Sequence, residues 1–321
     1  MRASGSGALY ELPSVGRWEF GGFAYGTEPL VLPGVGEPDG PEGESPDVVD
    51  YAGSCRHLAA LGQRGLLIPE VQASESPDEL FWFRWLTGHQ VCFVTWRLIA
   101  QAVDDLAERR LPAAEALSLI SRYVDGYAAM LLYTGSCPPG LYNALIRPSM
   151  RRRHRAFSGA WAPDYWPIRD LFRRRRLSGA DGADMTELHD SIGLLHLIHD
   201  GVAARLVTDG RSLLREAAVR GPGHRPAGLI YDAYFTTLRA PVTRREVVGQ
   251  LLRRLVAIAQ DIAVNGLYAP DDTDDRPPEL RSAEVTKCEN GLVDILHGVA
   301  QQACDLPPQP LTSRRTSMAE E

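Results

Sequence analysis

The sequence predicts an all-α protein that folds as a single helical domain with an irregular N-terminal arm. From Asp47 onward apolar residues recur at helical spacing, and strands do not alternate with helices. The chain has 321 residues, of which 44% are hydrophobic, and this is enough for one large core. We therefore expect an arm over residues 1–45, a helical domain over 46–305 and a disordered tail over 306–321.

Boundary signals place the individual helices. Pro112 stands at a favoured first helical position and Gly135 at a favoured end. Capping boxes are expected at Asp184 with Glu187 and at Thr243 with Glu246. The expected helices are 47–63, 78–110, 112–135, 140–157 with an interruption at Pro148, a short segment at 165–176, 185–207, 243–265 and 279–304. Residues 18–20 and 29–32 in the arm are expected to form short β-like pieces.

Composition excludes several classes of protein. The five cysteines are scattered without a Cys-x-x-Cys pair, so we expect free thiols. No run approaches the ~18 apolar residues of a membrane span, and the N-terminus lacks the apolar stretch of a secretory signal. We therefore expect a cytoplasmic protein with no membrane partner.

Two arginine clusters, 151–155 and 173–176, allow three interpretations. They can be a solvated helix face, a binding surface for carboxylates of a substrate or cofactor, or a nucleic-acid surface. The net charge of −7 argues against the third, so no nucleic-acid partner is expected.

Residues 79–106 predict an aromatic helix with one titratable group at its centre. At about 100° per residue, the side chains of Trp82, Trp85, Phe93 and Trp96 fall within roughly 40° of His89. Histidine suits proton transfer near neutral pH, and wide aromatic faces suit a flat cofactor or an aromatic substrate. The alternative is a core helix whose histidine is only hydrogen-bonded.

The helix expected at 185–207 carries His189, His196 and His199. Apolar residues surround His199 on the helical wheel, whereas His196 lies about 60° away at the edge of that stripe. His199 is therefore expected to be the most buried of the three, and a buried histidine on an apolar face suits an axial haem ligand. The alternatives are a core histidine bonded to a carbonyl and, with less support, a non-haem metal held by His196 and His199 together.

A third motif lies in residues 158–172. Tyr165 and Arg169 stand one helical turn apart, and Asp170 follows. The planar fork of an arginine can grip a carboxylate while the neighbouring ring covers the substrate, and Asp170 can accept its ammonium group. The alternative is an Arg–Asp pair on the surface.

Together these motifs resemble tryptophan 2,3-dioxygenase in type and order. The residues that carry the resemblance are His89-Gln90, Ser158-Gly159 with Tyr165, Arg169 and Asp170, and His199 with Arg205. The chain length and residues 156–172 are more similar to bacterial haem-dependent L-tyrosine 3-hydroxylases, which make L-DOPA for natural products containing modified prolines. The resemblance covers about residues 78–240 by motif order.

The resemblance implies a helical haem-binding catalytic domain of the tryptophan 2,3-dioxygenase type over 46–305. It implies hydroxylation of L-tyrosine to L-DOPA in natural-product biosynthesis, with hydrogen peroxide as oxidant. Its cofactor would be haem b, with His199 as axial iron ligand and His196 as the second choice. It also allows a homodimer.

The same resemblance assigns roles to the remaining site residues. His89 would move protons, Trp82, Trp85 and Phe93 would shape the site, and Arg169 with Tyr165 and Asp170 would bind the substrate. Ala203 and Arg205 would lie beside the haem. Ala203 stands where related tyrosine-modifying enzymes carry a haem-attaching cysteine, which implies non-covalent haem.

The chain departs from the dioxygenases in the segment after the helix expected at 185–207. The dioxygenases have a GTGGS run that helps bind the substrate ammonium, whereas this chain has TDGRSLL at 208–214. That contact is therefore not carried over. Two other functions stay open, an indole-ring dioxygenase using the same haem with dioxygen, and a non-catalytic helical protein that binds haem or another small molecule.

Overall fold

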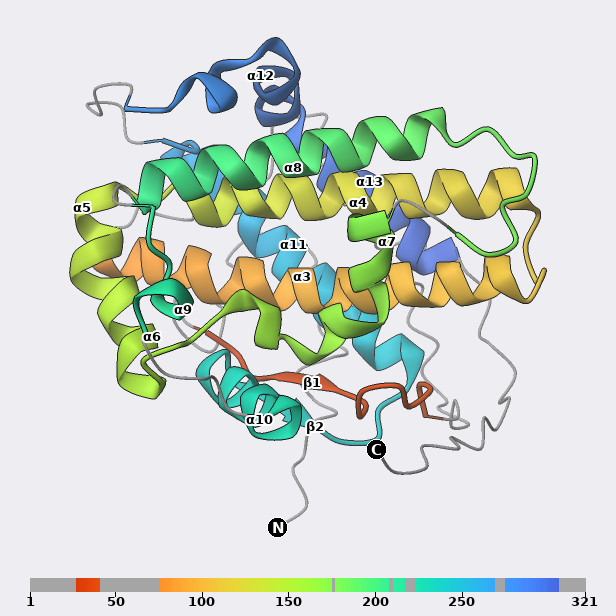
Figure 1. The fold of residues 1–321 in the computed structure, drawn as a ribbon, viewed down its shortest axis with the longest axis horizontal. Helices are drawn as coiled ribbons and strands as arrows, with labels where there is room; N and C mark the ends of the chain where they lie inside the picture. Colours follow the sequence, from red (N-terminus) through yellow and green to blue (C-terminus); the bar gives the residue numbers. More distant parts are fainter. Residues whose placement is uncertain are drawn as a thin grey trace.

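The described residues form a bundle of long helices with one pair of short strands along its edge (Figure 1). A computed structural model describes residues 27–40, 76–174, 177–207, 210–217, 223–268 and 275–305. Its helical content confirms the predicted all-α class. The helix expected at 47–63, the β-like piece at 18–20 and the tail at 306–321 lie outside the described residues.

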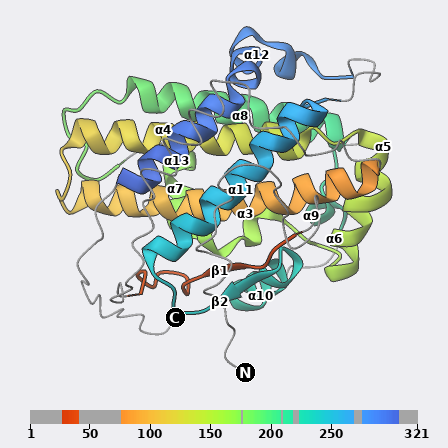
Figure 2. The ribbon, with the colours of Figure 1, turned by 180° about the vertical axis from the view of Figure 1, so that it is seen from behind.

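Three long helices form the centre of the bundle. They are α3 (Pro77–Ala107), α4 (Ala113–Gly135) and α8 (Thr186–Leu206). Helix α4 packs against α3 on one side and α8 on the other, as both ribbon views show. Helices α11 (Arg244–Asn265) and α13 (Leu292–Asp305) cover one face of this layer (Figure 2).

Short elements surround the central layer. Segment η3 (Pro163–Ile168) packs on α3, and α7 (Arg169–Arg174) follows it directly. The others are α5 (Pro139–Leu141), η1 (Tyr142–Ile146), α6 (Arg147–Arg153), η2 (Gly159–Trp161), α9 (Leu213–Glu216), α10 (His224–Tyr234), η4 (Pro278–Arg281) and α12 (Ala283–Asn290). Of these, α10 packs against η2 and α6, while η4 and α12 pack on α8.

The two strands fix the N-terminal segment to the bundle. Strand β1 (Leu30–Leu32) pairs in parallel with β2 (Thr237–Arg239). The side-chain amide of Gln250 on α11 both accepts from the Val31 N–H and donates to its carbonyl, each at 2.8 Å. These bonds satisfy an N–H and a carbonyl that would have no hydrogen-bond partner in a sheet of only two strands. The β-like piece predicted at 29–32 is thus confirmed, whereas β2 was not predicted.

Helix boundaries follow the predicted signals in most places. Thr243 and Glu246 form the predicted capping box of α11, and Gly266 ends that helix with a φ of 68°. The box predicted at Asp184 with Glu187 is wrong, because the Asp184 carboxylate accepts from the Thr186 N–H at 2.9 Å, one residue earlier.

Pro148 does not interrupt a helix as expected. The π-helical segment η1 runs directly into α6, and Pro148 lies in the first turn of α6, so the chain stays helical through this proline. The helix predicted over 140–157 ends earlier, at Arg153, because the backbone of His154 is extended.

A buried ion pair sets the position of α3 relative to α4 and α11. The Arg84 Nε donates to Asp261 Oδ2 at 2.7 Å, and the Tyr133 hydroxyl donates to the same carboxylate at 2.6 Å. Arg84 also donates to the carbonyls of Gly266 and Leu267, so the loop after α11 is held as well. Because Arg84 is one residue before Trp85, this network helps to fix the aromatic face of α3.

Candidate functional site

His89 is held in one orientation by its own helix. Its Nδ1 lies 2.7 Å from the Trp85 carbonyl oxygen, and since a carbonyl only accepts, Nδ1 carries the proton. The Nε2 then has a free lone pair, and it has no hydrogen-bond partner among the described residues. Burial lowers the pKa of His89 to about 4, although the bond to the carbonyl acts in the opposite direction. The imidazole is therefore neutral near pH 7.

Phe235 is the centre of the aromatic cluster around His89. The His89 and Phe235 rings stack with centroids 4.6 Å apart, and Trp85 lies 4.2 Å from His89. Trp82 meets Tyr234 edge to face at 6.2 Å. The other rings within 6.4 Å of Phe235 are Trp85, Phe93, Phe157, Tyr231 and Tyr234. The predicted aromatic face of α3 thus packs against rings from α10 and its C-cap.

The contribution of α10 was missed at the sequence level. Tyr231, Tyr234 and Phe235 stand at positions i, i+3 and i+4, which is the spacing of one helix face. That spacing is the signal that could have found them. The structure adds these three residues to the candidate site.

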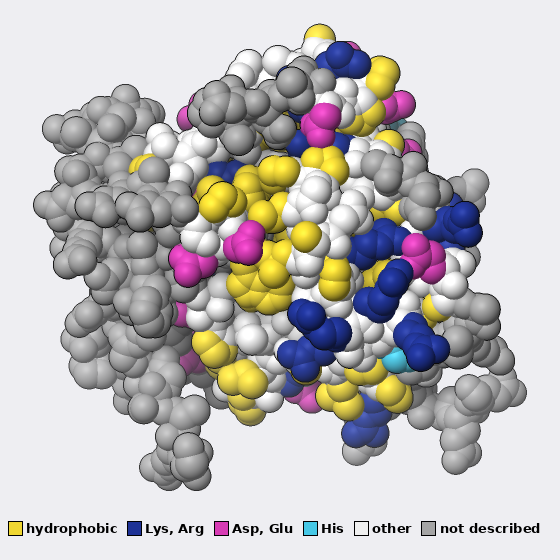
Figure 3. Space-filling view, turned by 90° about the vertical axis from the view of Figure 1, so that its left-hand side faces the viewer, with side chains coloured by type: hydrophobic (Ala, Val, Ile, Leu, Met, Phe, Trp, Pro, Cys, Tyr) yellow, Lys and Arg dark blue, Asp and Glu magenta, His cyan; other side chains and the backbone are white. Residues whose placement is uncertain are grey.

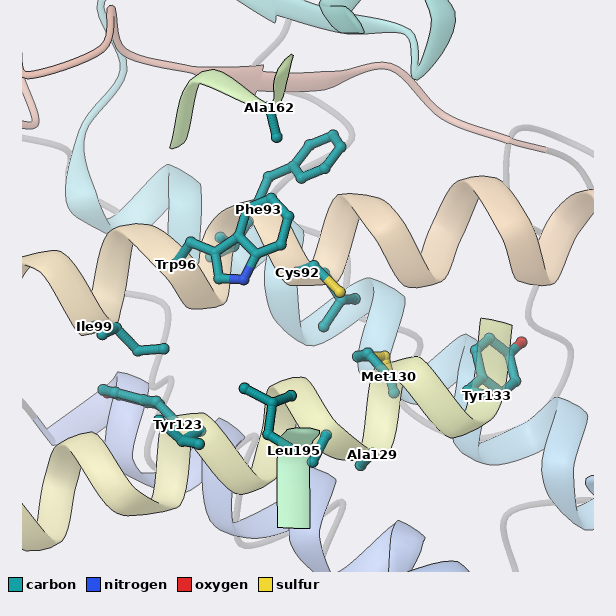
Figure 4. Packing of buried hydrophobic residues seen from close by; sticks show 14 of the residues in the cluster. Cys92, Phe93, Trp96, Ile99, Tyr123, Ala129, Met130, Tyr133, Ala162 and Leu195 are labelled. Atoms are coloured by element: carbon teal, nitrogen blue, oxygen red, sulfur yellow. The ribbon is translucent and has the colours of Figure 1, made fainter. Parts of the chain in front are cut away.

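Trp96 begins a second aromatic cluster two turns further along α3. Its ring lies 5.2 Å from Tyr127 of α4 and 5.2 Å from Tyr165 of η3, in edge-to-face geometry. Tyr165 in turn stacks on Phe172 at 5.9 Å. Phe93 joins the two clusters, because it lies 5.6 Å from Trp96 and 5.3 Å from Phe235. Figure 4 shows Phe93 and Trp96 projecting from α3 near Ala162.

Tyr165 belongs to this second cluster, and Arg169 follows it at the start of α7. The Arg169 side chain is 41% exposed, and its Nε is 3.9 Å from an Asp170 oxygen, too far for a hydrogen bond. That Nε has no hydrogen-bond partner within the described chain. Asp170 is more exposed than Arg169. Arg169 and Asp170 thus form a loose ion pair at the surface, which is the alternative that the sequence analysis left open.

An ionic network that the sequence analysis did not single out fixes η3. Arg239 of β2 donates two hydrogen bonds to Asp164, at 3.0 and 2.7 Å, and two more to Asp232 of α10. Asp164 is buried and directly precedes Tyr165. The network therefore joins the residue before Tyr165 to β2 and α10.

The structure contradicts the expected burial of His199. Its side chain is 62% exposed, with Nδ1 3.3 Å from an Asp200 oxygen, and Ala203 one turn later is exposed too. The physical reason lies at Gly201, where a Cβ would be 2.7 Å from Leu280 of η4. This close approach turns the buried side of the second half of α8 toward η4 and away from the stripe around His199.

His196 is half-buried and is therefore less exposed than His199. One turn before it, a Cβ on Gly193 would meet nothing within 4 Å, so the space beside this turn is open. Asp200, one turn after it, is 78% exposed and so remains solvated. Among the described residues no three His, Cys, Asp or Glu side chains gather to hold a metal ion by themselves.

Arg205, which the resemblance placed beside a cofactor, makes several contacts within the fold. Its Nε donates to Asp275 at 2.7 Å, and its guanidinium also donates to the carbonyls of Gly135 and Cys137. The side chain is 1% exposed. Arg205 therefore joins the end of α8 to the end of α4.

The first arginine cluster is a solvated helix face. The arginines of the cluster on and just after α6 are exposed, and Figure 3 shows basic side chains gathering on the face of the molecule that carries α6. Arg151 and the nearby Arg147 pair with Glu216 of α9. In the second cluster Arg173 is exposed, whereas 175–176 lie outside the described residues.

The composition also led to predictions about the cysteines and about membrane-spanning helices. Cys92, Cys137 and Cys288 are free thiols, as expected, and Cys55 lies outside the described residues. In the described part of the chain no helix has both the length and the apolar character needed to cross a membrane.

Residues 53–191 match a family model described as SfmD 3-methyl-L-tyrosine peroxygenase. The match covers less than half of the chain. It includes His89, Tyr165 and Arg169 but ends before His196 and His199 of α8. No curated protein matches the chain. The activity and the substrate in that description are those of the matched family.

Proposed function

We propose that the protein is a haem-dependent hydroxylase that uses hydrogen peroxide to convert L-tyrosine to L-DOPA. The observation that carries this proposal is the neutral His89, whose unpartnered Nε2 lies in an aromatic cluster. Such a group can take up a proton, and the surrounding rings suit an aromatic substrate. The similarity of residues 53–191 to a peroxygenase family supports the same reaction class.

The histidines of α8 are the candidate axial ligands for the proposed haem. We propose His196 as the ligand, because it is half-buried and open space lies beside Gly193 one turn before it. An aspartate one turn after the ligand would need solvation beside a porphyrin edge, and Asp200 is 78% exposed. His199, the ligand that the sequence favoured, becomes the second choice, and Ala203 one turn after it provides no thiol for a covalent link.

When bound, the haem would supply the iron at which peroxide is activated for transfer of one oxygen atom. The chain's own residues would then handle protons and position the substrate. His89 Nε2 would accept a proton from one peroxide oxygen and deliver it to the other, which leaves as water. Its fixed Nδ1–H bond to Trp85 keeps Nε2 as the proton-accepting atom.

Substrate binding is assigned to residues on both sides of Phe93. Arg169 would bind the substrate carboxylate, Tyr165 would cover the substrate, and Asp170, which lies beside Arg169, would accept its ammonium group. Trp82, Trp85 and Phe93 would bound the ring. A ring-substituted tyrosine such as 3-methyl-L-tyrosine, which the family description names, is the substrate to compare with L-tyrosine.

Two other functions make different predictions for the products. An indole-ring dioxygenase would open the ring of L-tryptophan with dioxygen, and a non-catalytic haem-binding protein would turn over no aromatic amino acid. The tyrosine-type substrate in the family description favours hydroxylation over both.

Product analysis tests the proposal. The haem-loaded protein would be incubated with oxygen-18-labelled hydrogen peroxide and, in separate reactions, L-tyrosine, 3-methyl-L-tyrosine and L-tryptophan. We expect one labelled oxygen on the ring of a tyrosine substrate. A ring-opened indole product, or no product from any of the three, would overturn the proposed reaction.

A further inference from the structure

Exposed arginines gather on the surface formed by α6 and α9. Figure 3 shows basic side chains grouped on this side of the molecule, with apolar side chains beside them. Within residues 142–163 and 210–217 the sequence has one acidic residue, Glu216. The surface is thus strongly basic on a chain whose net charge is −7. Its exposed arginines are Arg151, Arg152, Arg153 and Arg155, on or just after α6, and Arg211 and Arg215, on or just before α9.

Ion pairs use only part of this positive charge. Arg147 donates to the Arg211 carbonyl at 2.7 Å and to Glu216 at 2.6 Å, and Arg151 pairs with the same carboxylate. These contacts fix α9 to α6. The other three arginines of the α6 cluster have no ion pair within the described residues. Because like charges on one surface repel, an acidic partner would relieve this repulsion as well as pair with the arginines.

Apolar side chains lie next to the arginines. Leu214 of α9 is 44% exposed and precedes Arg215. The helical stretch from α5 through η1 to α6 runs without a break over residues 139–153, and Leu141 and Leu145 in its first half are half-buried. At 1.5 Å per residue this stretch is about 20 Å long, the length of a helix of about four turns. Arginines beside a few apolar contacts are typical of surfaces that bind another protein.

The same features disfavour a membrane or a nucleic acid. A helix that lies in a membrane interface buries its apolar side chains about 5–10 Å deep, whereas Leu141 and Leu145 pack against the protein core. A membrane or a nucleic acid would also extend past the arginines and meet the rest of the chain, which is acidic. Charges are screened beyond about 8 Å at physiological ionic strength, so a short acidic segment would interact mainly with the arginines.

We propose that the surface of residues 139–155 and 211–216, which we call the α6 face, binds an acidic amphipathic helix of another protein. The carboxylates of this helix pair with the arginines that have no ion pair, and its apolar side chains pack on Leu145 and Leu214. The inference goes beyond the proposed function and does not rest on it, because no residue of the α6 face takes part in the proposed reaction.

Peptide binding to charge variants tests the proposal. The probe is a fluorescein-labelled helical peptide of glutamate and leucine, and fluorescence anisotropy measures its binding to the full chain at an ionic strength of about 0.15 M. Arg152→Glu should weaken binding roughly tenfold, because it replaces an attraction by a repulsion. The matched control is Arg122→Glu, an equal change of charge at an exposed arginine of α4, which should leave the affinity nearly unchanged.

A second pair of measurements tests the apolar contacts and the need for carboxylates. Leu214→Ser should weaken binding of this peptide but not of a peptide with alanine in place of every leucine. A peptide with glutamine in place of every glutamate should not bind. Circular dichroism of each variant checks that it is folded. Equal losses in Arg152→Glu and Arg122→Glu, or binding of the glutamine peptide as tight as that of the glutamate peptide, would overturn the proposal.

Other occupants of the α6 face give different results. The two further probes are a single-stranded DNA oligonucleotide and vesicles of phosphatidylserine and phosphatidylcholine in equal parts. If either binds as tightly as the peptide and Arg152→Glu removes that binding, an acidic protein helix is the wrong occupant. Sedimentation velocity tests for a second copy of the chain, and self-association that Arg152→Glu removes would also overturn the proposal.

Hydroxylation of L-tyrosine in parallel samples separates this inference from the proposed function. Arg152→Glu should hydroxylate like the wild type, because Arg152 has no part in the proposed reaction. Peptide binding without hydroxylation would overturn the proposed function alone. Hydroxylation without peptide binding would overturn the inference about the α6 face alone.

Discussion

At the scale of single residues, the protonation state of His89 decides how it can act. Its pKa is lowered to about 4 by burial, so Nε2 is unprotonated at neutral pH and acts first as a base. We therefore expect the rate of hydroxylation to show no ionisation of His89 between pH 6 and 9, and to fall as the pH approaches 4. An inflection near pH 6.5 that disappears in His89→Phe would show instead that the group titrates like a free histidine.

Substitution of His89 tests its role in proton transfer. His89→Phe keeps an aromatic ring against Phe235 and removes the nitrogen, so haem content and fold should survive while the rate falls by ~10²–10⁴-fold. His89→Asn should fall between this variant and the wild type. The measurement is steady-state DOPA formation with the haem spectrum as control. Wild-type activity in His89→Phe would assign the residue to packing.

Arg169 is expected to recognise the substrate carboxylate. Arg169→Lys keeps the charge but loses the planar fork, so tyrosine binding should weaken by roughly 1.5–3 kcal/mol. Tyramine, which lacks the carboxylate, should be a poor substrate of the wild type. The kcat/KM values for both compounds measure this, and equal values would mean that Arg169 does not bind the carboxylate.

At this scale the sequence predicted part of the candidate site. The face shared by Trp85, His89 and Phe93 follows from the spacing within one helix, and so does the pairing of Tyr165 with Arg169. The contact of His89 with Phe235 joins segments far apart in the chain, so local spacing could not predict it. The exposure of His199 depends on the packing of Gly201 against η4. A helical wheel of α8 alone gives no information about that contact.

At the scale of elements, helix α8 carries both candidate iron ligands, His196 and His199. We expect His196→Ala to lose stable haem binding and His199→Ala to retain it, because the iron would lose its protein ligand only in the first variant. Titration of each variant with hemin, followed in the Soret region, measures this. The opposite pattern would restore His199 as the ligand.

The packing of α3 against α11 depends on the buried pair of Arg84 and Asp261. Arg84→Leu should lower the free energy of unfolding by about 3–5 kcal/mol, because Asp261 would keep a buried charge without its partner. Urea denaturation gives the value. Arg151→Ala is the matched control, since Arg151 is exposed where it pairs with Glu216, and its loss should cost about 1 kcal/mol or less. Equal losses in the two variants would contradict this account.

The elements themselves were predictable where their signals are local. Periodicity and boundary residues predicted α3, α4, α8 and α11 closely. The short helix α10 was not predicted, and neither was β2. A three-residue strand carries little periodic signal, and β2 is stabilised by β1, which lies about 200 residues earlier in the sequence.

At the scale of the whole molecule, His89 also links stability to pH. Its pKa is lower in the folded state, so the unfolded chain binds a proton between pH 6.5 and about 4 that the folded chain does not. The free energy of unfolding should therefore be unaffected above pH 6.5 and fall by up to ~3 kcal/mol as the pH drops to 4, at 1.36 kcal/mol per unit of pKa.

The pKa of His297 is lowered as well, so the variant His89→Phe is needed to isolate this effect. Urea denaturation at pH 7 and pH 4.5 should show a smaller pH-dependent loss in the variant than in the wild type. The same loss in both proteins would mean that His89 is accessible to protons in the folded state.

The all-α class was predictable because apolar periodicity runs through most of the chain, whereas the function depends on a group that the chain itself does not contain. Titration of the purified protein with hemin, followed by its visible absorption spectrum and by acid–acetone extraction, tests that dependence most directly. We predict uptake of one haem per chain with a histidine-ligated spectrum, and release of the haem by acid–acetone because Ala203 and its neighbours provide no thioether. A protein that stays colourless with added hemin would contradict the account.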